Sequence, residues 1–370
     1  MAAGIRAVWP DAQIDRCPMS DGGEGFVDAM VSACGGRFVT HRVTGPLPEM
    51  AVDARFGLLD SQPCAPSHAG GAYGPSPACA VIEMSAASGL ALLSRDQYDP
   101  YATTTFGTGE LLRAAVERGC RAILLGIGGS ATIDGGIGCC QAAGLPVLLD
   151  DGEPTSPTEP LCGRDLPRVV RVKSHRGESI SGVQITVACD VTNPLCGPRG
   201  AAHVFGAQKF SGRPAPGQLE EFDQWLRQYA ARCGKLDIAE LPGAGAAGGL
   251  GFALMAFFGA SMQPGAELVI EATGLRQRLR GADLCITGEG RFDRSSLDGK
   301  APVRVAELCR MVGVPCHAVV GTADPADGGP FDSIGVILDR AGSFEQSQAR
   351  AAEFGAQLAA EILSKHLGAT

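Results

Sequence analysis

Loops that carry Gly, Asp, Glu, Ser or Thr follow four points where an apolar strand is expected to end. In the last of them, residues 284–287 form a short apolar strand, and Gly288-Glu289-Gly290 then allows a tight turn that leaves Glu289 and Asp293 at the strand's carboxyl end. The same pattern occurs in residues 17–25, 123–136 and 185–194. Ligands of open α/β sheets bind at the carboxyl edge of the strands, so the four junctions predict one convergent polar site.

The run Gly-Ile-Gly-Gly-Ser-Ala-Thr at residues 126–132 is the leading candidate for phosphate binding. Gly128 and Gly129 let backbone N–H groups face an anion, and Ser130 and Thr132 add hydroxyl donors where a helix can start. The run matches neither Gly-x-x-x-x-Gly-Lys-Ser/Thr nor Gly-x-Gly-x-x-Gly, so a packed glycine turn is an equally good interpretation. The second glycine-rich block, residues 242–251, favours close helix packing over ligand contact.

Phosphoryl transfer from ATP requires acidic side chains, because oxygen ligands hold Mg²⁺ and a carboxylate often takes the proton of the acceptor hydroxyl. A single acid beside a glycine or at a strand end is most often a helix cap or a turn residue. Six acids in such positions together indicate a functional site. They are Asp21, Glu24, Asp134, Asp190, Glu289 and Asp293.

A cation must offset the charge of a transferred phosphoryl group. Lys209, Arg291 and Lys300 lie in or next to the motifs, and each alone is typical of a solvated surface charge. Lys209 and Lys300 are the two strongest functional candidates. Serine-nucleophile chemistry is not supported, since Gly129-Ser130-Ala131 does not form a Gly-x-Ser-x-Gly elbow.

The composition of the 370 residues favours a cytoplasmic globular protein. The formal net charge is −9 and the basic residues are scattered, which argues against nucleic acid as a partner. No apolar run approaches the roughly 20 residues of a membrane span, and the first residues lack the apolar block of a signal peptide. The sequence leaves open a homodimer.

The 14 cysteines form no Cys-x-x-Cys motif, and most lie in apolar segments. This pattern favours buried free thiols in a reducing compartment over disulfides or a zinc site. The six histidines are dispersed, and His317 lies in an apolar run typical of a core side chain.

Apolar strands alternate with amphipathic helices, which predicts an α/β fold. Helices are expected at residues 25–34, 108–118, 219–233, 302–312 and 346–366, and parallel strands at 284–287, 316–320 and 333–338. Residues 38–43 and 51–59 predict an antiparallel pair. Exposed loops rich in proline and glycine are expected at residues 62–77, 152–160 and 211–217.

The change of pattern near residue 39 predicts two domains. Residues 1–38 and 275–370 are expected to form one doubly wound domain, into which a second α/β domain, residues 39–274, is inserted.

The motifs, taken in order, resemble those of the bacterial glycerate kinases of the first, two-domain class. The resemblance implies ATP-dependent phosphorylation of D-glycerate, usually to 2-phosphoglycerate, with Mg²⁺. It also implies a flavodoxin-like parallel-sheet domain that carries a large inserted α/β domain. The matching blocks are residues 18–25, 82–90, 103–110, 126–138, 188–197, 204–209, 242–251 and 286–300.

Two features depart from the family pattern. Family members normally open with an apolar strand and a loop containing Asp-Ser-Phe-Lys, and residues 1–6 match the end of the helix that follows, so we expect that strand and loop to be missing. Ile133 stands where the family usually has Asn before Asp134, and an apolar side chain there is expected to remove one hydrogen bond to substrate or phosphate.

The resulting hypothesis gives each candidate residue a role. Asp190 is the general base, and it holds Mg²⁺ together with Glu289 and Asp293. Lys209 and Lys300 neutralise the phosphates. The remaining candidates bind glycerate or phosphate, and they are Asp21, Glu24, Gly128, Gly129, Ser130, Thr132, Asp134, Asn193 and Arg291.

Two alternatives remain. One is a truncated, catalytically impaired paralogue that only binds a small hydroxy acid, and the DNA just upstream of Met1 would distinguish it from a mis-set start. The other, an NAD-dependent oxidoreductase, is weak because no Gly-x-Gly-x-x-Gly follows an early strand.

Overall fold

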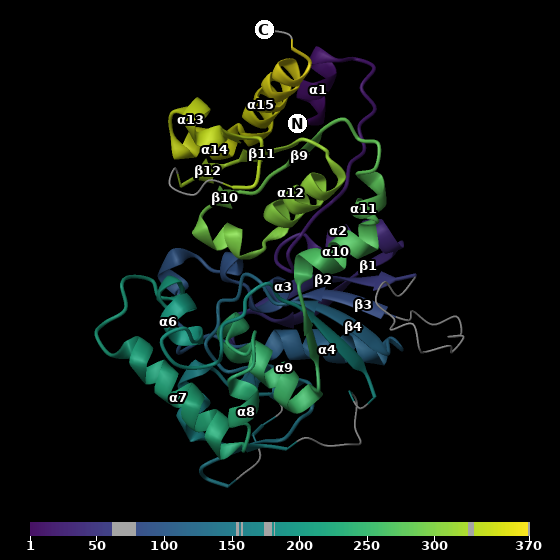
Figure 1. The fold of residues 1–370 in the computed structure, drawn as a ribbon. Helices are drawn as coiled ribbons and strands as arrows, with labels where there is room; N and C mark the ends of the chain where they lie inside the picture. The colour runs from purple at the N-terminus through teal and green to yellow at the C-terminus, as the bar shows by residue number, and fades with distance from the viewer. Residues whose placement is uncertain are drawn as a thin grey trace. The chain divides into compact units, whose positions relative to one another are not determined.

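Two stretches that are far apart in the sequence form one unit of the computed structural model (Figure 1). Met1–Pro18 and Gly274–Thr370 make up this terminal unit, and Met19–Thr273 make up the central unit. The structure describes residues 1–60, 79–152, 155–156, 158–173, 180, 182–324 and 329–368. The loop expected at residues 62–77 and part of the loop expected at 152–160 therefore lie outside the described residues.

The first boundary between the units differs from the expected one. The inserted domain was expected to begin at residue 39, whereas the central unit begins at Met19. The reason is that helix α2 (Phe26–Cys34) buries Phe26 and Met30 in a core with residues of the central sheet. The second boundary, at Gly274, lies one residue from the expected position.

The central unit is built on a six-stranded mixed sheet. Strands β1 and β2 form the expected antiparallel pair, and β2 is antiparallel to β3. The other four strands run parallel, so their carboxyl ends share one edge. In spatial order the strands are β1 (Gly36–Thr44), β2 (Ala51–Leu59), β3 (Cys79–Glu83), β4 (Ala122–Gly126), β7 (Gln184–Ala188) and β8 (Ser261–Gln263).

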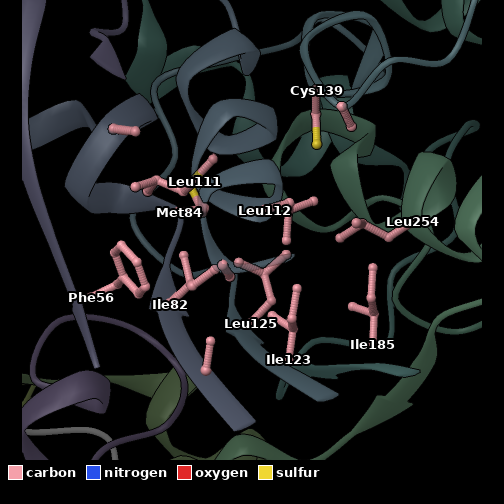
Figure 2. Close-up of a cluster of buried hydrophobic side chains, with 14 of the residues drawn as sticks. Phe56, Ile82, Met84, Leu111, Leu112, Ile123, Leu125, Cys139, Ile185 and Leu254 are labelled. Carbon is pink, nitrogen blue, oxygen red and sulfur yellow. The ribbon is translucent and has the colours of Figure 1, made fainter. Parts of the chain in front are cut away.

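Helices cover both faces of this sheet, which is why its inner strands are apolar throughout. Ile82 and Leu125 point toward Leu112 of helix α4 on one face (Figure 2), and the alternate residues Val81 and Leu124 pack against α2 and α10 on the other. The helices of this unit after α2 are α3 (Ser85–Ser88), α4 (Phe106–Glu117), α5 (Ile137–Ala142), α6 (Ala201–Phe205), α7 (Gln218–Arg232), α8 (Leu236–Ala239), α9 (Leu250–Phe258) and α10 (Gly265–Thr273).

A second core of the central unit forms between α5, α7 and α9 and the antiparallel pair β5 (Val147–Leu149) and β6 (Val169–Val172). Helix α9 belongs to both cores, because Leu254 packs toward the sheet while Phe252 packs on Tyr229 of α7. Its continuous apolar sequence follows from this double burial.

The terminal unit has a three-stranded parallel sheet in the order β13-β11-β9. Val320 packs with Val303 of α12 on one face, and Val319 packs with Leu358 of α15 on the other. The elements of this unit are α1 (Ala2–Val8), α11 (Leu275–Arg278), β9 (Cys285–Thr287), β10 (Arg291–Phe292), α12 (Ala301–Val312), β11 (Cys316–Val320), β12 (Thr322–Ala323), β13 (Ser333–Val336), α13 (Ile337–Ala341), α14 (Phe344–Ala349) and α15 (Ala351–His366).

Two expected elements near the C-terminus differ in extent. The helix expected at residues 346–366 is two helices, α14 and α15, because the backbone leaves the helical region at Arg350. The strand expected at 333–338 ends at Val336, where α13 begins. No helix in the described part of the chain is long and apolar enough to cross a bilayer.

Candidate active site

The parallel strands of the central unit carry acidic and glycine-rich segments at their carboxyl ends. Glu83 ends β3, the glycine loop (residues 126–132) follows β4, and Asp190 follows β7. Burial raises the pKa of Glu83, and a hydrogen bond from the backbone N–H of Val27 at the start of α2 opposes that shift.

The acidic loop (residues 20–25) packs directly on the glycine loop. The backbone N–H of Gly128 donates to the carbonyl of Gly22 at 3.2 Å. A Cβ at Gly128 would lie 2.7 Å from Gly23, so only glycine allows this approach. Asp21 accepts from the N–H of Gly23 at 3.2 Å, which shapes the turn and leaves the Asp21 side chain half-buried.

Asp190 lies at the same edge of the sheet. Its Oδ2 accepts from the backbone N–H of Ala266, at the start of α10, at 3.4 Å. The charges of both Asp190 and Asp21 raise the pKa of Cys189, after the larger effect of burial, which indicates that the two carboxylates share this region. Asn193 lies farther along and donates to the carbonyl of Arg199 at 2.8 Å.

Hydrogen bonds with Ser88 and Leu90 fix the conformation of the glycine loop. Gly129 is exposed and has φ +72°, a left-handed conformation suited to glycine. Its carbonyl accepts from the N–H of Leu90 at 2.8 Å, and the N–H of Ala131 donates to Ser88 at 3.0 Å. These bonds fix the loop while Gly129 remains exposed and Gly128 is half-buried.

Lys209 supports the loop from beneath. Its side chain is only 1% exposed, and its Nζ donates to Ser130 Oγ at 2.8 Å and to the carbonyl of Thr132 at 2.6 Å. Burial lowers the pKa of Lys209 to about 7, and the negative charge of Asp134 opposes part of that shift. A solvated surface charge, the ordinary alternative for a lysine, is excluded by this burial.

Thr132, the last residue of the glycine loop, and Asp134, which follows it, are fully buried. Asp134 accepts from the N–H and the hydroxyl of Thr105 at 2.8 and 2.7 Å, and from the N–H of Gly136 at 3.1 Å. Burial raises the pKa of Asp134, while these bonds oppose the shift. The hydroxyl of Thr132 has no hydrogen-bond partner.

Ile133 points into the second core of the central unit, together with Ile137 and Leu166, and is 0% exposed. The expectation that its apolar side chain removes a hydrogen bond to the ligand stays a prediction, and the structure adds that this side chain packs in the core. At this position an apolar residue contributes to packing.

The second glycine-rich block, residues 242–251, packs closely against Thr132 of the glycine loop, in line with its predicted packing role. Gly248 has φ +63°, and a Cβ there would collide with the carbonyl of Thr132. The adjacent Ala247 also has a positive φ of 51°. The carbonyl of Gly248 accepts from the N–H of Gly135 at 3.0 Å.

The remaining candidates gather in the terminal unit, after β9. Arg291 Nε pairs with Asp293 Oδ2 at 3.1 Å, and the Arg291 side chain is 78% exposed. Lys300 is the N-cap of α12 and is half-buried, as is Glu289.

A pocket of about 890 Å³ opens at the carboxyl ends of β9 and β11 within the terminal unit. This is the size of a small-molecule site. It is lined by Gly290, Arg291, Gly321, Thr322, Asp324 and Phe344, with other residues of α13, α14 and α15.

Sequence reasoning missed Glu83 and Thr105 as parts of the site. Both lie in blocks that resemble the family, residues 82–90 and 103–110, but neither adjoins the glycine turns that directed attention to other acids. Their contacts with Val27 and Asp134 join segments distant in sequence.

The chain is similar to known proteins over most of its length. The protein-family model described as glycerate kinase family matches residues 1–366 of this chain. Glycerate kinase of Halalkalibacterium halodurans is 41% identical over 86% of this chain and 79% of that protein, and glycerate 2-kinase of Escherichia coli (strain K12) is 40% identical over 90% and 81%. A crystal structure described as glycerate kinase 2 from Salmonella typhimurium LT2 is similar with a TM-score of 0.74 and 37% identity, covering 98% of this chain and 91% of that one.

Proposed function

Because this chain belongs to the glycerate kinase family, we propose that it transfers the γ-phosphoryl group of ATP to D-glycerate, with Mg²⁺, to give 2-phosphoglycerate. The observation that carries the proposal is the glycine loop, where the exposed backbone of Gly129 lies above the buried side chain of Lys209. Backbone N–H groups and a nearby cation are the features that bind an anionic group.

In the central unit, the glycine loop binds the carboxylate of glycerate or a phosphate. Lys209 acts through Ser130, because its ammonium is covered by the loop and donates to the Ser130 hydroxyl. Asp21 and Glu24 of the acidic loop hydrogen-bond the hydroxyls of glycerate. The contact of the two loops at Gly128 and Gly22 supports this division of roles.

Asp190 removes the proton from the acceptor hydroxyl. It follows the parallel strand β7, and its Oδ2 accepts from the backbone N–H of Ala266 at 3.4 Å, which holds the carboxylate at the same edge of the sheet as the glycine loop. Proton removal by a positioned carboxylate makes the oxygen a better nucleophile at the moment of attack.

The acidic residues suit Mg²⁺ bound mainly through ATP. Within the described residues, no three acidic side chains place their oxygens around one point, and Mg²⁺ commonly takes one or two carboxylates plus phosphates and water. Glu289 and Asp293, which lie in the same unit as the pocket at the carboxyl ends of β9 and β11, are the residues that would hold it. When bound, the ion neutralises charge on the transferred phosphoryl group.

The pocket of the terminal unit holds the nucleotide. Phe344 lines it and is 60% exposed, so its ring is available to stack on a base, and Arg291 supplies a cation for the phosphates. We place the reaction in the cytoplasm, where ATP is available.

The test is incubation of the chain with MgATP and D-glycerate, followed by phosphorus NMR. A 2-phosphoglycerate signal is the expected result. A 3-phosphoglycerate signal would correct the regiochemistry, and soluble, folded protein that gives neither product would contradict the proposal.

A further inference from the structure

Three thiols converge inside the terminal unit, at the edge of the sheet opposite the candidate site residues of that unit. The sulfur atoms of Cys285, Cys309 and Cys316 all lie within 4.8 Å of one another. Cys285 and Cys316 are the first residues of β9 and β11, whereas Glu289 and the pocket lie beyond the last residues of those strands.

Each thiol is fixed by regular structure. Cys285 and Cys316 are direct partners in the parallel register of β9 and β11. Cys309 lies in the last turns of α12, and the N–H of Val314 donates to its carbonyl at 2.9 Å where the chain turns back toward β11. Three ligands on rigid elements give a site that needs little rearrangement on binding.

The burial and the neighbours of the thiols favour a soft ligand. Cys309 and Cys316 are buried, while Cys285 is half-buried and gives access from solvent. His317 is the residue after Cys316 in β11. Its Nδ1 contacts Ser333 Oγ at 2.7 Å, so this ring nitrogen is engaged outside the group of three thiols.

We infer that Cys285, Cys309 and Cys316 form a binding site for a thiophilic d¹⁰ cation, Zn²⁺ or Cu(I). The thiols lose their protons to solvent as the metal–sulfur bonds form, without any change of oxidation state. Among the described residues no fourth histidine, cysteine or acid joins the group, so Zn²⁺ would complete its tetrahedron with water, whereas Cu(I) accepts three sulfurs. The cation joins α12 to β9 and β11 and stabilises the terminal unit.

The test uses the full chain, reduced and stripped of metal under anaerobic conditions. Zn²⁺ or Cu(I) is titrated in competition with a chromophoric chelator, and thermal unfolding is recorded with and without metal. One tight equivalent per chain and a metal-dependent rise in the unfolding temperature are expected. The metal that competes more strongly identifies the ion.

Cysteine variants show whether the tightly bound metal ion occupies the site formed by Cys285, Cys309 and Cys316. Cys285→Ser and Cys309→Ser should each weaken its binding by more than the roughly 10- to 100-fold that loss of an outer partner costs a metal site. Cys17→Ser is the matched control, since Cys17 is a half-buried free thiol of the same unit outside the group. Cys285 is half-buried, so its variant keeps the test valid if Cys309→Ser fails to fold. Tight binding that survives Cys285→Ser, or no tight equivalent for either metal, would overturn the inference.

Discussion

Lys209 Nζ donates to Ser130 Oγ at 2.8 Å, which places a fully buried ammonium directly beneath the glycine loop. The same Nζ donates to the carbonyl of Thr132 at 2.6 Å. The loop's conformation and its attraction for an anion therefore depend on one side chain from a different segment of the central unit.

At a pH below 7, where Lys209 holds its proton, Lys209→Met should lower kcat/KM for glycerate by about tenfold or more, because a hydrogen bond from a charged donor is worth about 1.5–3 kcal/mol. Steady-state kinetics at fixed MgATP measures the effect. Lys173→Met removes an exposed lysine of the same unit and should leave kcat/KM unchanged. Equal behaviour of the two variants would exclude the supporting role of Lys209.

The pKa of Lys209 makes the stability of the central unit depend on pH. With a folded pKa of about 7 against an ordinary value of 10.5, the unfolded chain holds a proton that the folded chain has lost in the window between them. The free energy of unfolding should therefore rise with pH from about 7 upward, by at most about 1.4 kcal/mol per pH unit. Denaturant titrations of wild type and Lys209→Met at pH 7 and 8 give the difference. A rise of the same size in the variant would assign it to other groups.

Gly248→Ala should destabilise the central unit more than a substitution with the same backbone strain elsewhere. Gly234 has φ +65°, close to the +63° of Gly248, but nothing lies within 4 Å of a Cβ at Gly234, whereas a Cβ at Gly248 collides with the carbonyl of Thr132. We expect a loss of about 1–2 kcal/mol for Gly234→Ala. Gly248→Ala should lose about 1–3 kcal/mol more and also activity, because the loop must move. Chemical denaturation and kinetics of both variants provide the comparison.

Asp190→Asn should reduce kcat by about 10²- to 10⁴-fold, the usual contribution of a general base. Asn keeps an oxygen that can accept from Ala266, so the thermal unfolding temperature should stay near that of wild type. Kinetics and a thermal scan on the same preparation separate the two effects. An unchanged kcat would remove Asp190 from the role of base.

Phe344→Ala should raise KM for ATP about fivefold or more, since loss of about 1 kcal/mol of stacking is a factor of about five. KM for glycerate should not change. Met311→Ala is the control, because Met311 is 76% exposed in the same unit and does not line the pocket. If both variants leave KM for ATP unaltered, the nucleotide does not bind against Phe344.

The sequence by itself determined the order of elements and the class of fold. Strands such as β3 and β4 are buried on both faces, so their continuous apolar sequences indicate a parallel sheet that is covered by helices. The glycine turns show where these strands end. Local pattern also located the hairpin of β1 and β2, because alternation and turn residues act over a few positions.

Only the tertiary structure decided what lies beneath those turns. The burial of Lys209, the contact of Asp134 with Thr105 and the inward direction of Ile133 each join segments that no local pattern connects. The three thiols were assigned to ordinary core packing for the same reason, since their spacing in the sequence forms no motif. Their approach follows from the pairing of β9 with β11 and the packing of α12, and such long-range packing is specified by the whole core rather than by neighbouring residues.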